Sequence, residues 1–192
     1  MLSRKQDKIY IAFIVKSNKK IGFGHLMRCK VLLKKFQRMI KCNIKFFSKV
    51  YLNKLSNFNI VITDLPDINE KQLKQIKKHN KLLVSIDDGH KIKFPSDILI
   101  NPNINPKIKN YFFKKTKYFS GKDYIILREE FEKFAKKTKI ILKKSKQIFV
   151  CFGGSDAKNL TEKLIRIFKK INLNPLVRIN FILGPLFGST KK

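Results

Sequence analysis

Short apolar segments alternate with amphipathic ones along the first hundred residues, and this alternation restricts the possible fold more than any other feature. The run KIYIAFIV at 8–15 is apolar and partly β-branched, as in a buried strand, and turn-forming residues follow it at 17–24. From Gly24 onwards, apolar residues recur with a helical period and lysines fill the positions between them. Further strands are predicted at 43–47, 59–63, 81–86 and 97–100, and another helix at 69–78. Strands and helices in this rhythm predict an α/β fold with a parallel sheet that carries helices on both faces.

The carboxyl-terminal part of the chain predicts a second set of such elements. Residues 107–146 mix aromatic and basic side chains, with a charged helix expected at 128–139 whose Phe131, Phe134 and Ala135 face inward. A strand, a helix and another strand are then predicted at 147–152, 160–171 and 177–183. We therefore expect a complete Rossmann-like amino-terminal domain at 1–145, and at 146–192 the first βαβ unit of a second Rossmann-like domain.

The charge and the cysteines exclude several classes of protein. The formal net charge is +31, but only six of the 44 basic residues are arginine and the two halves of the chain carry almost equal charge. Groove readout and bidentate phosphate contacts favour arginine, so no nucleic-acid partner is expected. The three cysteines form no CxxC pair, which favours a reducing compartment and no structural zinc. The apolar run near the start is too short to cross a bilayer and no cleavage site follows it, so we expect a cytoplasmic protein without a membrane partner.

The sharpest chemical motif is the turn IGFGH, which stands between the first predicted strand and helix. Gly22 and Gly24 would let the backbone approach a ligand closely, and a helix amino terminus offers unpaired N–H groups to an anion. His25 falls in the first helical turn, where the helix dipole disfavours the imidazolium form, so it could act as a general base. The alternative is a glycine-containing turn with a capping histidine.

Two further turns could carry chemistry. In Gly153-Gly154-Ser155-Asp156 the glycine amides could cradle phosphate or a sugar hydroxyl, or else Asp156 or Ser155 could simply cap the following helix. Asp87-Asp88-Gly89-His90 is similar to a group of metal ligands, although turn formation is the favoured interpretation. Cys29, at a helical spacing, is interpreted as a core residue.

Four segments resemble a known family in their order and spacing: IGFGHLMRC, SIDDGHKIKFPSDILINPN, GKDYIILREEF and IFVCFGGSDAKNLTEKLI. They are similar to the UDP-2,4-diacetamido-2,4,6-trideoxy-β-L-altropyranose hydrolases of pseudaminic acid biosynthesis. The resemblance implies a two-domain GT-B-like fold and an inverting cleavage of the anomeric C–O bond of a UDP-sugar, without a metal or another cofactor. It implies that His25 is the general base for water. It also implies a set of substrate-binding residues, which are Gly22, Gly24, Arg28, Gly153, Gly154 and Ser155.

The sequence also differs from the family pattern. Asp64 is followed by Leu65 and Pro66 where the family has a tyrosine, and the region between Phe47 and Asn59 is shorter by about one strand and helix. The sequence stops after the second strand of the second domain, which predicts a truncated domain and a separately encoded remainder as a possible partner. The alternative to an enzyme is therefore a non-catalytic remnant or a sugar-phosphate-binding module of the same fold.

Overall fold

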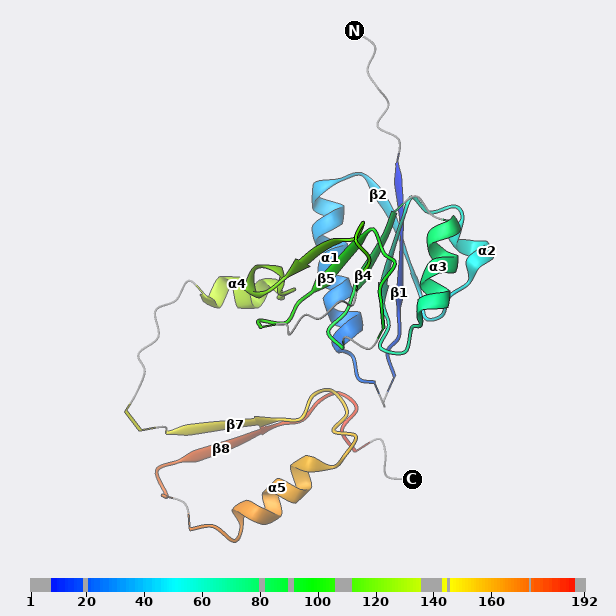
Figure 1. Cartoon of the computed structure of the whole chain (residues 1–192). Coiled ribbons are helices and arrows are strands. Elements are labelled where there is room, and N and C mark those ends of the chain that lie inside the picture. Colours follow the sequence, from blue (N-terminus) through cyan, green and yellow to red (C-terminus); the bar gives the residue numbers. More distant parts are fainter. Residues whose placement is uncertain are drawn as a thin grey trace. The chain divides into compact units, whose positions relative to one another are not determined.

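The structure, a computed structural model, describes residues 8–18, 21–79, 82–89, 92–105, 112–135, 143–144, 146–172 and 174–188. The chain divides into two compact units (Figure 1). Unit 1 consists of Met1–Lys16 and Gly24–Glu132, and unit 2 of Ser17–Phe23 and Lys133–Lys192. The assignment of functional domains at 1–145 and 146–192 stays a prediction.

Unit 1 is built on a six-stranded parallel sheet with a Rossmann-like strand order. The order across the sheet is β2 (Cys42–Phe47), β1 (Ile9–Val15), β3 (Ile60–Asp64), β4 (Leu82–Ile86), β5 (Ile98–Asn101) and β6 (Lys117–Ser120). The chain first runs from β1 to β2 and then returns to place β3 on the other side of β1, so the order reverses between β1 and β3. The predicted α/β Rossmann-like fold is confirmed.

Helices cover both faces of this sheet because successive strand residues point to opposite sides. On one face Ile11 and Phe13 of β1 pack with Cys29 of α1 (Gly24–Met39). On the other face the core includes buried side chains of α2 (Leu52–Leu55) and α3 (Glu70–His79). Figure 1 shows α1 on one side of the sheet and α2 and α3 on the other.

One packing prediction is wrong. Phe131, Phe134 and Ala135 of α4 (Glu129–Ala135) were expected to face inward, but all three are exposed, the two phenylalanines to 51% and 57%. The reason is an interaction between α4 and α1, in which Lys35 pairs with Glu132 at 2.7 Å and Arg38 pairs with Glu129 at 2.5 Å. These two glutamates share one helix face, and the phenylalanines, each two residues further on, lie on the opposite one.

Unit 2 contains the predicted strand, helix and strand. β7 (Gln147–Cys151) and β8 (Arg178–Ile182) pair in parallel, and α5 (Leu160–Phe168) connects them. Phe168 of α5 packs edge-on against Phe181 of β8, with ring centroids 6.1 Å apart. The sequence pattern therefore predicted this βαβ unit correctly.

Three described elements of unit 1 were not predicted, namely α2, the edge strand β6 and the short 3₁₀ helix Lys122–Tyr124 that follows β6. No helix within the described residues is long and apolar enough to cross a membrane.

Candidate functional site

A group of charged side chains lies at the carboxyl-terminal edge of the sheet, where the strand order reverses. Asp64 is the last residue of β3 and stands beside Val15, the last residue of β1. His25 is the second residue of α1, which follows β1 after the glycine turn. Asp88 lies in the segment that directly follows β4. Open α/β sheets bind their ligands at such a switch point, because the loops that follow the two neighbouring strands diverge there.

The central contact of this group joins His25 to Asp64. The Nδ1 atom of His25 lies 2.7 Å from Oδ1 of Asp64. An ionised carboxylate can only accept hydrogen bonds, so at this distance Nδ1 carries the proton and donates it to Asp64. In the neutral ring the lone pair is then on Nε2, which is the atom that can accept a proton from a ligand or from water.

Arg28 connects Asp64 to a second carboxylate. Its Nε atom donates to Oδ2 of Asp64 and its Nη2 atom donates to Oδ1, both at 2.5 Å, which makes a bidentate pair. Its Nη1 atom donates to Oδ2 of Asp88 at 2.9 Å. The loop that carries Asp88 is held in turn by the amide of Asn103, which donates to the Asp88 carbonyl at 3.2 Å.

The environment keeps Asp64 ionised although its side chain is only 1% exposed. Burial raises the pKa of Asp64, but hydrogen bonds from Arg28 and His25 and the charge of Arg28 outweigh burial and hold the pKa below its usual value. Burial lowers the pKa of Arg28, yet the pairs with Asp64 and Asp88 raise it overall. Burial and the neighbouring Asp64 both raise the pKa of the Cys29 thiol, whose Sγ atom lies 3.5 Å from Oδ2 of Asp64. Cys29 is therefore a buried core residue, as expected, and not an activated thiol.

Of the predicted site residues, the structure brings the side chains of His25 and Arg28 together. The two glycines of the predicted turn precede His25 in the sequence. Gly22 has a positive φ of 84°, and its N–H donates to the Asn18 carbonyl at 2.7 Å. Gly24 is the first residue of α1. Among the described residues outside the immediate chain neighbours, none has an atom within 4 Å of the position that a Cβ would occupy on Gly22, and the same is true of Gly24.

Sequence reasoning considered Asp88 only as a metal ligand or turn residue and Asp64 only as the residue before Leu65, and it did not connect either with His25. Both follow apolar strand residues at the same edge of the sheet, and carboxylates at the ends of neighbouring parallel strands are the signal that could have identified them. Arg28 donates to Asp64 and Asp88 through three of its nitrogen atoms, and its expected contact with substrate stays a prediction.

The second glycine turn belongs to unit 2. Gly153 has a positive φ of 76°, and a Cβ on Gly184 would clash with the carbonyls of Gly153 and Gly154. Asp156 accepts hydrogen bonds from the backbone N–H groups of Leu160 and Thr161, both at 2.8 Å. The carboxylate of Asp156 thus caps the first turn of α5, as expected, although the N-cap position itself is occupied by Asn159 and not by Asp156 or Ser155.

This cap restricts what unit 2 can bind and where. Slight desolvation raises the pKa of Asp156, but the hydrogen bonds from Thr161 and Leu160 outweigh it and lower the pKa. A negative charge already occupies the amino terminus of α5, so a phosphate would be repelled there. A hollow of about 470 Å³ lies beside it, and buried Ser155 is one of its lining residues.

The described residues contain no group of three or more His, Cys, Asp or Glu side chains placed to hold a metal ion. Asp87 and Asp88 follow β4, whereas His90, the last residue of the same motif, lies outside the described part of the chain.

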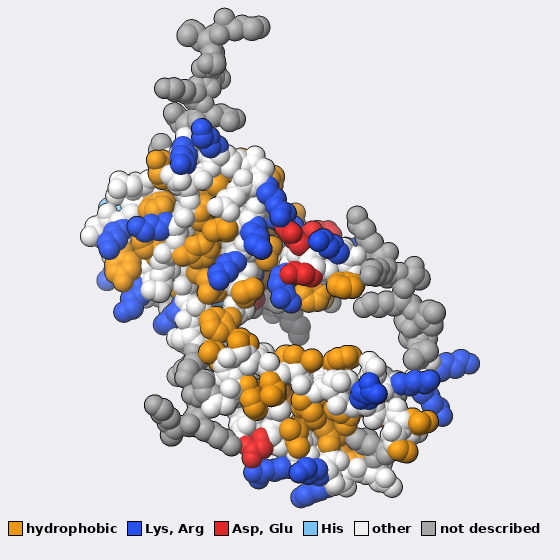
Figure 2. Space-filling model, turned by 180° about the vertical axis from the view of Figure 1, so that it is seen from behind, with side chains coloured by type: hydrophobic (Ala, Val, Ile, Leu, Met, Phe, Trp, Pro, Cys, Tyr) orange, Lys and Arg blue, Asp and Glu red, His pale blue; other side chains and the backbone are white. Residues whose placement is uncertain are grey.

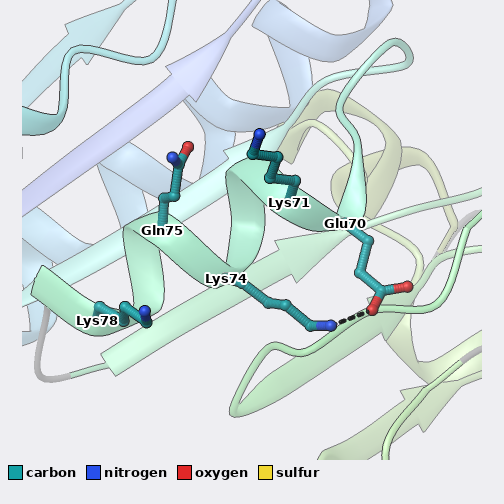
Figure 3. Close-up of a pocket in the computed structure, with 5 residues that line it drawn as sticks. All are labelled: Glu70, Lys71, Lys74, Gln75 and Lys78. Carbon is teal, nitrogen blue, oxygen red and sulfur yellow. Dashed lines mark ion pairs between the residues drawn. The ribbon is translucent and has the colours of Figure 1, made fainter.

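A hollow of about 510 Å³ runs along the outer face of α3 (Figure 3). Figure 3 shows Lys71 and Gln75 pointing the same way, while Lys74 reaches Glu70 in an ion pair of 2.6 Å. All the residues that line this hollow come from one helix. They do not include a histidine paired with a carboxylate, as His25 is with Asp64. We therefore place the candidate site at the sheet edge and not at this hollow.

The basic side chains do not mark a binding surface for an anionic partner either. Figure 2 shows Lys and Arg side chains dispersed over the visible face and not gathered in one patch. This distribution agrees with the even spread of charge along the sequence.

Together, these features define a Rossmann-like α/β protein with a histidine–carboxylate pair at the switch point of its sheet. No family model matches the chain. The chain is 30% identical, over 209 aligned positions, to the uncharacterized protein MJ1062 of Methanocaldococcus jannaschii, with 92% of this chain and 43% of that protein covered. It is 29% identical, over 175 positions, to the UDP-2,4-diacetamido-2,4,6-trideoxy-beta-L-altropyranose hydrolase of Campylobacter jejuni, with 79% and 62% covered.

The chain therefore spans less than two thirds of the length of either relative. A distant relative is named as a UDP-sugar hydrolase, and this agrees at the level of the family with the resemblance of the four sequence segments.

Proposed function

We propose that the protein hydrolyses a UDP-linked diacetamido-trideoxy sugar, with His25 as the general base. The observation that carries the proposal is the 2.7 Å contact between Nδ1 of His25 and Asp64 at the switch point of the sheet. The name of the Campylobacter jejuni relative supports the choice of substrate class.

In the proposed reaction Nε2 of His25 accepts a proton from water while the water oxygen forms a bond to the anomeric carbon. The bond between that carbon and the diphosphate oxygen breaks, and its electron pair leaves with UDP. The attack from the face opposite UDP would invert the anomeric centre. Asp64 stays ionised, fixes the ring orientation and stabilises the imidazolium that forms. The aspartate of a Ser-His-Asp triad acts on its histidine in the same way.

For unit 2 we propose a role in binding the nucleotide. The turn at Gly153, Gly154 and Ser155 supports this role, because a positive-φ glycine allows backbone N–H groups to approach an anion closely. The α5 terminus is excluded from that role by Asp156. A GT-B-like pairing of two Rossmann-like domains, with a boundary near 145, belongs to the same proposal.

A second candidate function is sugar-phosphate binding without turnover. It is favoured by one observation, namely that Leu65 and Pro66 follow Asp64 where the resembled family has a tyrosine. A module of this kind would bind the UDP-sugar and release it unchanged.

Incubation with UDP-2,4-diacetamido-2,4,6-trideoxy-β-L-altropyranose in H₂¹⁸O tests the proposal. We expect UDP release with the ¹⁸O label in the free sugar, because water attacks carbon. Label in UDP would show attack at phosphorus and would contradict the mechanism. Saturable binding of the UDP-sugar by calorimetry, with no UDP release, would favour the binding module instead.

A further inference from the structure

We propose that Arg28 is a positioning residue that keeps His25 in its proton-accepting form by compensating the charge of Asp64. This inference rests on the proposed role of His25 as a base, and it gives Arg28 a function other than contact with the substrate.

The geometry of Arg28 supports this role. Three of its nitrogen atoms donate to protein carboxylates, two of them to Asp64 and one to Asp88. Its side chain is only 15% exposed, and Asp64 is almost fully buried beneath it. The guanidinium is thus fixed between a buried carboxylate and a loop carboxylate.

The charges around His25 determine whether the ring holds one proton or two. Among the described residues, the contacts of this cluster come from Asp64 on β3, from Arg28 and Cys29 on α1, and from Asp88 after β4. Asp64 attracts an imidazolium. Arg28, with Nη2 only 2.9 Å from Nδ1 of His25, and the positive end of the α1 dipole both repel one.

The hydrogen-bond geometry explains why Arg28 does not simply replace Asp64 as the partner of the ring. Nδ1 uses its proton on Asp64, so it has no lone pair in the ring plane to accept from Arg28, although Nη2 of Arg28 lies 2.9 Å from it. Nη2 donates instead to Oδ1 of Asp64. Arg28 therefore acts on His25 through charge and through the carboxylate that it holds.

Removal of Arg28 would leave Asp64 uncompensated beside the ring. An unopposed carboxylate at 2.7 Å favours the doubly protonated ring, which has no lone pair with which to accept a proton from water. A base that becomes protonated at neutral pH loses activity on the acid side of its pH–rate profile.

The direct test is an NMR titration of the His25 ring in the 192-residue chain, because it needs no substrate. The chain has three histidines, and the spectrum of H25N identifies the signal. In R28Q the titration midpoint should rise by about 1 pH unit or more. R28K keeps the positive charge and should restore a midpoint near the wild-type one. The matched control is R38Q, because Arg38 is on the same helix but pairs with Glu129.

A midpoint in folded R28Q within about 0.2 pH unit of the wild-type midpoint would overturn the inference. If R28Q does not fold, D88N decides the matter, since it keeps the buried pair of Arg28 with Asp64. Loss of the Asp88 charge leaves Arg28 less compensated, so the midpoint should fall, and a rise or no change would overturn the inference. A shift as expected in a chain that releases no UDP would support the role of Arg28 and reject the proposed hydrolysis.

Discussion

Replacement of Asp64 by asparagine should destabilise unit 1 strongly, because it leaves the guanidinium of Arg28 buried with one carboxylate partner fewer. Removal of one partner from a buried ion pair costs about 3–5 kcal/mol. Arg28 keeps its hydrogen bond to the half-exposed Asp88, so we expect the lower end of that range, about 3 kcal/mol. The double variant D64N/R28Q removes both charges and should recover part of this loss.

The matched control is D67N. Asp67 pairs with Lys16 at 2.5 Å, but both side chains are exposed, and exposed pairs contribute about 0–1 kcal/mol. Urea unfolding followed through the NMR amide signals of β1 and β3 reports on unit 1 alone. A cost for D64N below about 1 kcal/mol, or one equal to that of D67N, would refute the description of Asp64 as a buried, compensated charge.

The same carboxylate predicts the direction of the pH dependence. Because the pKa of Asp64 is lower in the folded protein than in the unfolded chain, its contribution to stability is present above the ordinary carboxyl pKa of about 4. That contribution is lost as the pH falls through the lower folded-state value. The stability difference between the wild type and D64N should therefore shrink in acid, and a difference that grows there would contradict the assigned sign.

The remaining predictions concern the two glycine turns. G22A should lower the free energy of unfolding by about 1 kcal/mol, because Gly22 has a φ of 84°. G24A, at an equally open position that starts α1, should leave that free energy unchanged or raise it. Equal losses in the two variants would reject the conformational explanation. D156A should reduce the hydrogen-exchange protection of the first-turn amides of α5. In the wild type, protonation of Asp156 in acid should have the same effect, so unchanged protection in D156A would reject its role as a cap.

The parallel strands were predictable because each is a short apolar run that must be buried on both faces. The edge strand β6 was not predictable in this way, since Lys117–Ser120 contains no such run and has no fully buried residue. Phe131 and Phe134 were misplaced because the ion pairs that orient α4 join residues more than 90 positions apart in the chain.

The site was predictable only in part for a related reason. The position of His25 follows from local signals, namely a strand, a glycine turn and a helix start. Its pairing with Asp64 depends on β3 lying next to β1, and nothing local to either segment specifies that strand order. The two carboxylate partners of Arg28 could not be predicted for the same reason, since they lie at or just after the ends of two other strands.

The central claim is that His25 is the base that activates water, and the rate of UDP release by H25N tests it most directly. The matched control is H79N, which alters an exposed histidine at the end of α3. A general base contributes about 10²- to 10⁴-fold, so kcat should fall by that factor in H25N with a smaller change in KM, while H79N keeps the wild-type rate. A kcat for H25N within about threefold of the wild-type value would contradict the account.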